Sequence, residues 1–564
     1  MTTIERRELT AGARSLDWPS DLHPVLRQVL ERRSLNSLDE LDLKLDALVP
    51  VGRFDELTLA VELLLAHRHS PIVIVGDFDA DGATSTALML LTLRQLGFSA
   101  VDYRIPDRFR QGYGLSTALV DSLDVPSGAL IVTVDNGISS HDGVAAARAR
   151  GIDVLITDHH LPPAVLPDAN AIVNPNLAAS PFPCKSLAGV GVVFYLLAAL
   201  GKALGSPSVV TRYLDLVALG TVADLVTLDQ SNRILVDQGI RRIRAGQCRP
   251  GVRGLLEVAG TEPAAVTTAT LGFRLGPRLN AAGRLDDMSV GVRCLVSESE
   301  TEARSLAESL DSLNRNRQDI EAGMKAEAMA IVDELELSAH SLPAAICLRR
   351  DEWHEGLVGL VASRVKERHH RPCFAFAATE GGDLKGSGRS IRGFHLRDAL
   401  AEVDALNPGL ISRFGGHAMA AGLTLRLQAF DQFCAAMLDI ASDRIDDEAL
   451  EKKMMSDGAL DPEHMSLEVA KLLRDAIPWG QGFPEPCFDD GFELIETRTL
   501  KEAHLKLRLK PVARGRIVDA IAFHQADVSW PVGTVRRIAY RLAVNDYFSD
   551  ERVQLVVEHI TAAD

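Results

Sequence analysis

Apolar and polar positions alternate in blocks between about residues 70 and 175. Continuous apolar runs of this length are typical of strands buried on both faces of a parallel sheet. We interpret three runs as strands, Ile72–Val75, Ala129–Val134 and Val154–Thr157, and two intervening segments as helices, Thr84–Leu96 and Gly143–Ala149. The alternation predicts a parallel α/β domain with right-handed crossovers. About 50 residues of helical appearance precede it.

A second block of structure follows a long helical segment. Glu298–Leu337 has no proline and one glycine, Gly323, with apolar residues at mostly helical spacing. It predicts one long helix that connects two domains. Beyond it, strands at Ala344–Leu348 and Phe374–Phe376 around a helix at Gly356–Arg368 predict a second α/β unit.

The last hundred residues have a period of two. Leu505, Leu507 and Leu509 alternate with Lys506, Arg508 and Lys510, so one face would join a core and the other would form a basic stripe. Several such short strands from about residue 465 predict a small barrel. We expect the charged, Met-containing segment from about 445 to 465 to be a linker.

Bulk composition narrows the class of protein. A chain of 564 residues suggests about three or four domains. Its seven cysteines include no CxxC pair, which indicates reduced thiols in a cytoplasmic protein. The first 14 residues have no apolar core of a signal peptide. The net charge of −17 opposes nucleic-acid binding by the protein as a whole, although local basic patches can override it.

Three carboxylates follow the first predicted strand. Asp77, Asp79 and Asp81 occupy every second position, so an extended backbone would point them the same way. The carboxyl end of a strand is where open α/β sheets bind ligands, and a hard divalent cation would relieve the repulsion. The alternative is an acidic turn that caps the next helix, but one Asp is enough for a cap.

Three further candidate ligands come from separate segments. Asp135 follows the second predicted strand, His159 follows the third, and Asp224 lies in an apolar helical stretch. Taken singly, each has an ordinary reading as a turn cap, a core histidine or an arginine partner. Together they favour Mn²⁺ or Mg²⁺ over zinc, and so many ligands suggest two ions about 3.5–4 Å apart.

These residues carry a family resemblance that covers nearly the whole chain from about residue 70. The chain resembles the DHH phosphoesterase superfamily, named for the motif present as Asp158-His159-His160, and within it the RecJ single-stranded-DNA exonuclease family. The matching stretches are GDFDADGATS at 76–85, TVDNGI at 133–138, TDHH at 157–160, LVALGTVADLV at 216–226, PRLNAAGRLDD at 277–287, WHEGLVGLVASR at 353–364, GSGRS at 386–390 and GGHAMAAG at 415–422.

The resemblance implies an α/β fold class with three functional domains. A parallel-sheet DHH domain would be joined by a long helix to a second α/β DHH-associated domain, followed by a C-terminal β-barrel of the OB-fold type. We expect an N-terminal helical leader at 1–65, the DHH catalytic domain at 66–295, the connecting helix at 296–340, the DHH-associated domain at 341–445 and the OB-fold at 460–564.

The resemblance also implies roles for the candidate ligands. The family's metal positions correspond to Asp77, Asp79, Asp81, Asp135, His159 and Asp224. His160 would lie near the metals and the scissile phosphate, and Asp158 would orient the loop or a histidine. No covalent nucleophile is needed; we interpret Thr84 and Ser85 as helix-capping residues.

Substrate contacts are expected outside the metal positions. We expect phosphate contacts from residues in segments rich in arginine or small side chains: Arg108, Arg278, Asn280 and Arg284. By resemblance, Ser387 and Arg389, on a glycine-bearing loop, would hold the 5′-phosphate, and Gly415, Gly416 and His417 would line the cleft. Lys506, Arg508 and Lys510 would track the single strand. The barrel's aromatic candidates, of which most would pack in the core, are Phe523, Trp530, Tyr540, Tyr547 and Phe548.

The resulting hypothesis is a metal-dependent 5′→3′ exonuclease that degrades single-stranded DNA to 5′-mononucleotides in recombination and repair. Family resemblance further suggests contact with single-stranded-DNA-binding protein and a RecQ-type helicase, a monomer, and no membrane association. Two alternatives remain: a DHH phosphoesterase acting on oligoribonucleotides or cyclic dinucleotides, and a nucleic-acid-binding scaffold without activity. The intact acid set argues against the scaffold.

Overall fold

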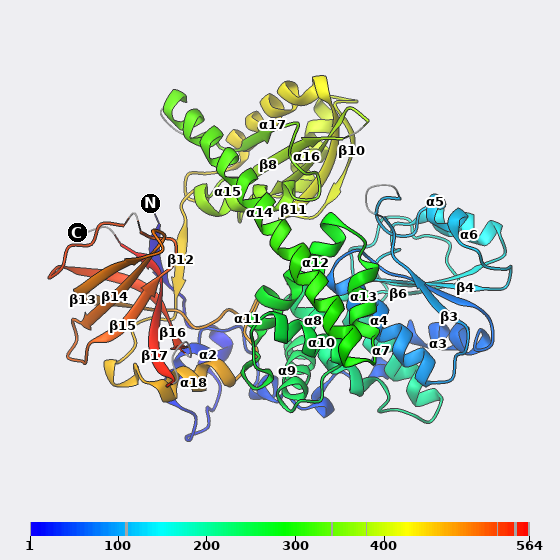
Figure 1. Cartoon of the computed structure of the whole chain (residues 1–564), viewed down its shortest axis with the longest axis horizontal. Coiled ribbons are helices and arrows are strands. Elements are labelled where there is room, and N and C mark those ends of the chain that lie inside the picture. The colour runs from blue at the N-terminus through cyan, green and yellow to red at the C-terminus, as the bar shows by residue number, and fades with distance from the viewer. Residues whose placement is uncertain are drawn as a thin grey trace. The chain divides into compact units, whose positions relative to one another are not determined.

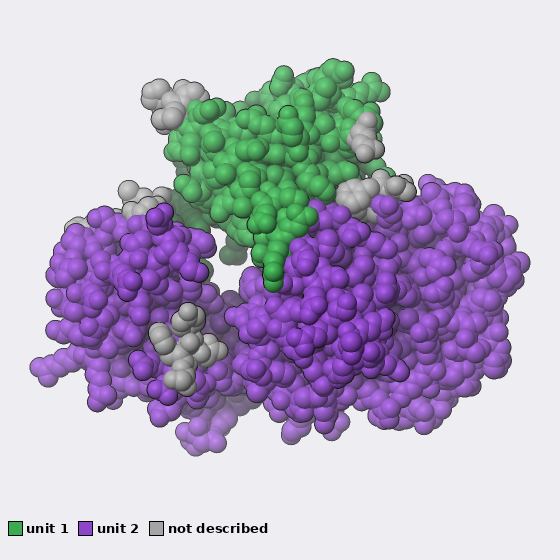
Figure 2. All heavy atoms as spheres, viewed as in Figure 1, with its two compact units in different colours: residues 1–5, 315–455 green, residues 6–314, 456–564 purple. Residues whose placement is uncertain are grey.

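The computed structural model describes residues 2–107, 111–339, 342–379, 381–526, 528–545 and 550–561. The chain divides into two compact units, coloured separately in Figure 2. The first contains residues 1–5 and 315–455, and the second contains residues 6–314 and 456–564. Among the described residues, no helix has the length and apolar character needed to cross a bilayer.

The second unit contains a five-stranded parallel sheet in the order β3-β2-β4-β5-β6. Figure 1 labels β3, β4 and β6 of this sheet. Its strands are β2 (Ile72–Val75), β3 (Val101–Arg104), β4 (Leu130–Val134), β5 (Asp153–Thr157) and β6 (Ala171–Val173). The three predicted strands are confirmed as β2, β4 and β5. The two edge strands were not predicted, because β3 contains the charged residues Asp102 and Arg104 and β6 has only three residues.

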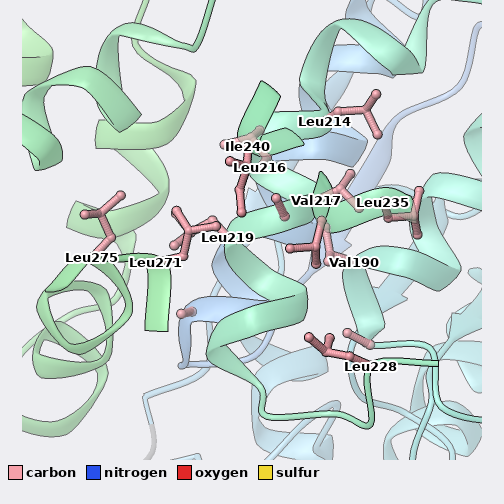
Figure 3. Packing of buried hydrophobic residues seen from close by; sticks show 14 of the residues in the cluster. Val190, Leu214, Leu216, Val217, Leu219, Leu228, Leu235, Ile240, Leu271 and Leu275 are labelled. Carbon is pink, nitrogen blue, oxygen red and sulfur yellow. The ribbon is translucent and has the colours of Figure 1, made fainter. Parts of the chain in front are cut away.

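Helices of this unit pack around the sheet. They are α3 (Leu57–Ala66), α4 (Ala80–Gln95), α5 (Thr117–Ser122), α6 (His141–Ala149), α7 (Gly189–Ala203), α8 (Leu214–Ala223), α9 (Gln230–Arg244), α10 (Pro250–Val258), α11 (Thr268–Thr270), the π-helical turn η6 (Leu271–Leu275), α12 (Gly276–Leu285) and α13 (Ser289–Val296). Figure 3 shows side chains of α7, α8, α9 and η6 meeting in one apolar cluster. This packing fixes the end of α8, where Asp224 follows.

The N-terminal region differs from the predicted helical leader. It begins with a strand, β1 (Thr3–Arg6), which pairs with β12 (Lys453–Ser456), and its helices α1 (Ala11–Arg14) and α2 (Pro24–Leu30) are short. Arg33 is buried and makes a two-pronged ion pair with Asp457, at 2.7 and 3.1 Å. The segment is therefore organised by partners far along the chain. The expected linker at 445–465 is likewise partly wrong, since it contains β12.

The second unit also includes a C-terminal barrel. Five strands close in the order β13-β14-β15-β17-β16. They are β13 (Phe488–Leu500), β14 (His504–Pro511), β15 (Val518–Ala522), β16 (Val535–Asn545) and β17 (Arg552–Ile560). The barrel prediction is confirmed, but the expectation of strands from residue 465 is wrong at its start, because helix α18 (Leu467–Asp475) precedes them.

The first unit is built on a second, mixed sheet in the order β10-β11-β9-β8-β7, in which only β7 and β8 are parallel. Its strands are β7 (Ile346–Arg349), β8 (Cys373–Ala378), β9 (Asp383–Arg389), β10 (Ile411–Gly416) and β11 (Ala420–Arg426). Its helices are α15 (Val358–His369), α16 (Leu396–Leu406) and α17 (Phe430–Arg444).

The predicted long helix is confirmed as α14 (Glu300–Ala339), with 40 residues. Its C-terminal part belongs to the first unit and is anchored there by charged groups. Glu321 accepts from Arg317 at 2.7 Å and from Arg364 at 2.9 Å, and Glu327 accepts from the indole of the buried Trp353 at 2.8 Å. These contacts anchor the C-terminal part of α14 to the rest of the first unit.

Candidate metal centre

Asp79 and Asp81 take different positions at the start of α4. Asp79 is the N-cap residue, and its carboxylate accepts a hydrogen bond from the backbone N–H of Gly82 at 3.0 Å. Asp81 is buried, and its two oxygens accept from the N–H groups of Gly189 and Val190, at 2.6 and 2.9 Å. The first turn of α7 thus fixes the Asp81 carboxylate by two amide bonds.

Thr84 and Ser85 do not cap α4. Both lie inside the helix and are fully buried, and the Thr84 hydroxyl donates to the carbonyl oxygen of Ala80 at 2.9 Å. The prediction is wrong because the helix begins at Ala80, four residues earlier than the periodicity indicated.

Asp135 follows β4 in a left-handed backbone conformation, with φ of 62°. Its Oδ1 lies 3.1 Å from Nε2 of His159. A β-carbon at Gly189 would lie 2.6 Å from this Oδ1, so only glycine fits there. The hydroxyl of Tyr113 donates to the carbonyl oxygen of Asp135 at 3.2 Å. The carboxylate is therefore placed by backbone strain and by close packing of α7.

The turn after β5 is organised by Asp158. Its Oδ1 accepts from the backbone N–H of His159 at 2.7 Å and lies 2.7 Å from Nδ1 of His160. Its Oδ2 accepts from the N–H of Ile138 at 2.9 Å. Asp158 thus orients both the loop and a histidine, as expected from the resemblance.

Asp224 caps the C-terminal end of α8, and its Oδ2 lies 3.5 Å from Nε2 of His159. His159 therefore faces two carboxylates from different elements. Among the described residues, three groups have ligand atoms within 4.8 Å of one another: Asp77, Asp79 and Asp135; Asp81, His159 and Asp224; and Asp135, His159 and His160. The structure brings together all seven residues predicted from separate stretches of sequence.

Burial and mutual repulsion perturb the ionisation of these groups. Burial, together with the charge of Asp79, raises the pKa of Asp81 to about 7. Burial and the neighbouring aspartates raise the pKa of Asp135 and Asp224 well above the ordinary value. Burial alone would lower the pKa of His160, but the hydrogen bond and charge of Asp158 outweigh it and raise this pKa to about 9. The acids are held close despite strong electrostatic opposition.

The donor set fits hard divalent cations. It combines several carboxylate oxygens with one or two imidazole nitrogens, within ligand distance of one another. Mn²⁺ and Mg²⁺ prefer such oxygen-rich sites, and a cation would offset the repulsion that raises these carboxyl pKa values. A two-ion site can be assembled from these groups because Asp135 and His159 each belong to two of the three groups.

The predicted phosphate contacts near this centre differ in their surroundings. Asn280 accepts from the backbone N–H of Ala80 at 2.8 Å, so it supports the acidic turn itself. Arg278 is paired with Asp311 at 2.9 Å. Arg284 lies in the last turn of α12. Arg108 lies outside the described residues.

Ser387 and Arg389 lie on strand β9, so the predicted loop is wrong. The glycines of this segment serve packing: a β-carbon at Gly386 would lie 2.2 Å from the ring of Phe376 on β8. Arg389 donates to the Ser387 hydroxyl at 2.8 Å, and burial lowers the pKa of its guanidinium. A β-carbon at Gly359, in the first turn of α15, would lie 2.7 Å from this guanidinium.

The remaining predicted contacts are spread over two elements. Gly415 and Gly416 end β10, and His417 follows, with its backbone N–H donating to Ala420 O at 2.8 Å. On β14 the predicted alternation is confirmed, since its leucines are buried and its basic residues face outward. However, Arg508 pairs with Glu496 at 3.3 Å. The basic stripe is therefore partly neutralised.

The barrel aromatics mostly pack inside, as predicted. Trp530 and Tyr540 are buried, whereas Phe523 is about half exposed. Tyr547 and Phe548 lie outside the described residues.

Sequence reasoning missed two contributors. The amides of Gly189 and Val190 were part of a run interpreted only as a buried helix, although a glycine at its start was a usable signal. Tyr113 was also missed; its ring makes edge-on contacts with Phe78 and His160, at centroid distances of 5.9 and 6.0 Å.

Comparison with known proteins agrees with this geometry. Three domain families match the chain: the DHH family N-terminal domain at 71–221, the DHHA1 domain at 342–443 and the RecJ OB domain at 456–559. The single-stranded-DNA-specific exonuclease RecJ of Salmonella typhimurium is 49% identical, over 99% of this chain and 98% of its own length. The chain belongs to the RecJ family. The Escherichia coli RecJ is also 49% identical, over 99% of this chain and 98% of the relative.

A solved RecJ structure supports the same assignment. The RecJ of Thermus thermophilus in complex with Mn²⁺ superimposes with a TM-score of 0.79 at 30% identity, covering 99% of this chain and 78% of that one. A second structure of that RecJ is in complex with Mg²⁺ and has a TM-score of 0.74, at 29% identity and with 99% and 76% coverage. The predicted fold class, with DHH, DHH-associated and OB-fold parts, is thereby confirmed.

Proposed function

We propose that the protein is a metal-dependent exonuclease that degrades single-stranded DNA from 5′ to 3′, releases 5′-mononucleotides and acts in recombination and repair. The proposal rests on the complete set of acids and imidazoles, which form groups whose ligand atoms lie within 4.8 Å of one another. The chain also matches a RecJ exonuclease over 99% of its length. RecJ of Thermus thermophilus binds Mn²⁺ and Mg²⁺, and we assign the same ions here.

The ligand set that we propose consists of Asp77, Asp79, Asp81, Asp135, His159 and Asp224. When bound, two ions supply Lewis-acid charge that polarises a phosphodiester and lowers the pKa of water. The α7 amides fix Asp81, and the hydrogen bond to Asp158 orients His160 and raises its pKa in the metal-free protein. With its Nδ1 held by Asp158, His160 would present Nε2 to a phosphate oxygen and stabilise the charge developing on it.

We assign the 5′-phosphate to Ser387 and Arg389. Two features support the assignment: the partly buried guanidinium donates to the hydroxyl, and the first turn of α15 approaches both side chains at Gly359. A guanidinium beside a hydroxyl and the first turn of a helix is a favourable anion site. Gly415, Gly416 and His417 remain candidates for lining the substrate path.

The remaining assignments follow the family. We propose the domain limits of the sequence analysis, with residues 66–295 catalytic and 460–564 binding single strands, a monomeric and cytoplasmic protein, and contacts with single-stranded-DNA-binding protein and a RecQ-type helicase. Arg108, Arg278, Asn280, Arg284, Lys506, Arg508 and Lys510 remain proposed substrate contacts. Because Arg278 is paired with Asp311 and Asn280 with the Ala80 amide, we propose that both act by positioning.

An end-labelled digestion tests the proposal. A 5′-phosphorylated single strand, its duplex and a dinucleotide are incubated with Mn²⁺ or with EDTA. We expect Mn²⁺-dependent release of mononucleotides from the 5′ end of the single strand, slower attack on blunt duplex, and loss of cleavage in Asp79→Ala. Preference for the dinucleotide would favour a small-substrate phosphoesterase. Undiminished cleavage by Asp79→Ala would exclude the proposed metal centre.

The 5′-phosphate assignment has its own test. Arg389→Met removes the guanidinium charge and keeps an unbranched apolar stem. We expect wild type to prefer a 5′-phosphate over a 5′-hydroxyl and the variant to lose that preference. An unchanged ratio of kcat/KM values for the two ends would refute the assignment without affecting the metal centre.

A further inference from the structure

A cavity of about 530 Å³ lies within the second unit, beside the end of α8. Its walls come from α8 and η6 on one side and from α18, β16, β17 and the segment between α18 and β13 on the other. Residues used below are Leu225, Phe273, Arg474 and Arg541. The volume falls within the range of about 300–1,000 Å³ that is typical of ligand sites.

Phe273 is the most exposed large apolar side chain among the described residues, at 80%. Its neighbours Leu271 and Leu275 are fully buried and pack into the cluster around α8, as Figure 3 shows. The π-helical turn η6 therefore turns two leucines inward and presents the phenyl ring outward, into the cavity. Single π turns are rare and occur frequently at functional sites.

Leu225 is the second unusual residue of this wall. It directly follows the candidate ligand Asp224, has a left-handed backbone with φ of 60°, and is 67% exposed. A leucine in this conformation is strained, and such strain concentrates at functional sites. Two large apolar side chains of this wall are thus exposed to solvent, and one of them directly follows a candidate metal ligand.

The charges of the cavity indicate what it binds. Arg541 is paired with both Glu485 and Glu558, and Arg474 with Asp475. These cations are therefore already neutralised by protein carboxylates and contribute little to phosphate binding. Uncharged planar groups that stack on a phenyl ring fit the apolar wall better.

We propose that this cavity binds bases of the DNA strand next to the scissile phosphate, with Phe273 as the stacking platform and Leu225 as an apolar support. The proposal rests on the proposed function and deepens it. The cavity is lined by residues on both sides of Asp224, Val222 and Leu225, and by the barrel strands β16 and β17, so it lies between the end of α8 and the domain proposed to bind single strands. Stacking on a phenyl ring accepts every base, as an exonuclease requires.

Binding to single strands in EDTA tests the proposal, because DNA is not cleaved without metal. Fluorescence anisotropy measures the affinity for a normal strand and for a series of strands. Each strand of the series has a window of three consecutive abasic positions at a different place in the sequence. We expect Phe273→Ala to bind the normal strand roughly 5- to 100-fold more weakly, the range expected for one lost base stack. With the abasic window at the matching position, wild type and Phe273→Ala should bind equally.

Two matched variants control the measurement. Phe273→Tyr keeps an aromatic ring and should bind within about twofold of wild type. Leu406→Ala removes a leucine that is 68% exposed in the first unit, and it should leave binding unchanged. Thermal unfolding should be the same for all variants, since Phe273 is exposed.

Equal affinity of wild type and Phe273→Ala for the normal strand would overturn the proposal, and the cavity would then be open to a protein segment. Equal weakening for every abasic window would overturn it too, since the effect would not depend on a base. Digestion of single strands by wild type is measured in parallel. If wild type digests DNA while Phe273→Ala binds normally, only this inference fails; if wild type does not digest DNA, the proposed function fails.

Discussion

Metal affinity should depend strongly on pH, because the pKa values of three proposed ligands, Asp81, Asp135 and Asp224, are raised in the metal-free protein. Asp81 is buried, and its pKa is raised from 3.8 to about 7. Binding of a cation requires the carboxylate, so protons compete with the metal below pH 7. Between pH 6 and pH 8 the charged fraction of such a group rises about tenfold, and the apparent affinity should rise by the same factor from Asp81 alone.

Asp135 and Asp224, whose pKa values are also raised, would increase this factor. The raised pKa also determines how the stability of the metal-free protein changes with pH. A carboxyl with a raised pKa favours the protonated folded state, so the metal-free protein should lose stability as the pH rises from about 4 to about 7. The shift of about three units for Asp81 corresponds to about 4 kcal/mol, and saturating Mn²⁺ should restore stability at pH 7.5.

Isothermal titration with Mn²⁺ at pH 6, 7 and 8, in two buffers of different ionisation enthalpy, measures both the affinity and the protons released. Circular dichroism at each pH verifies that the metal-free fold is intact. A dissociation constant that stays the same across this range, or binding without proton release, would refute the reasoning.

Three substitutions test other parts of the structure. Asp79→Asn keeps a capping side chain, whereas Asp79→Ala should cost about 1 kcal/mol of stability in urea unfolding; both should lose more than about 100-fold in nuclease activity. Gly189→Ala places a β-carbon 2.6 Å from a carboxylate oxygen of the metal centre and should weaken Mn²⁺ binding. The control Gly323→Ala has open space around it and should stabilise α14 by about 0.5–1 kcal/mol. Arg33→Ala breaks a buried ion pair and should lower the free energy of unfolding by about 3–5 kcal/mol, measured by thermal unfolding. The control Arg27→Ala, at an exposed ion pair, should lower it by less than about 0.5 kcal/mol. Comparable losses for the two arginines would contradict the structure.

The candidate ligands could be predicted because a local rule places them. Asp77, Asp135 and His159 each follow an apolar strand, and parallel strands bring their carboxyl ends to one edge of the sheet. The period of two likewise identifies the buried leucines of β14.

Features that depend on distant partners could not be predicted. The amides that hold Asp81 come from residues 108 and 109 positions later in the chain. Gly386 and Gly388 indicated a loop, yet they belong to β9, because phenyl rings on the neighbouring strand occupy the space of their missing β-carbons. Glycine marks a place where the backbone needs room, and only the packing determines whether a turn or a close neighbour requires it.

The ion pair between Arg33 and Asp457 joins residues 424 positions apart. During synthesis on the ribosome, the N-terminal arginine must wait until most of the polypeptide has emerged before its carboxylate partner exists. The α/β domain around the parallel sheet can fold earlier, since its contacts join residues that are closer in sequence. We therefore expect the beginning of this protein to be among the last parts to reach native structure, and to be exposed to chaperones and proteases until the barrel is complete.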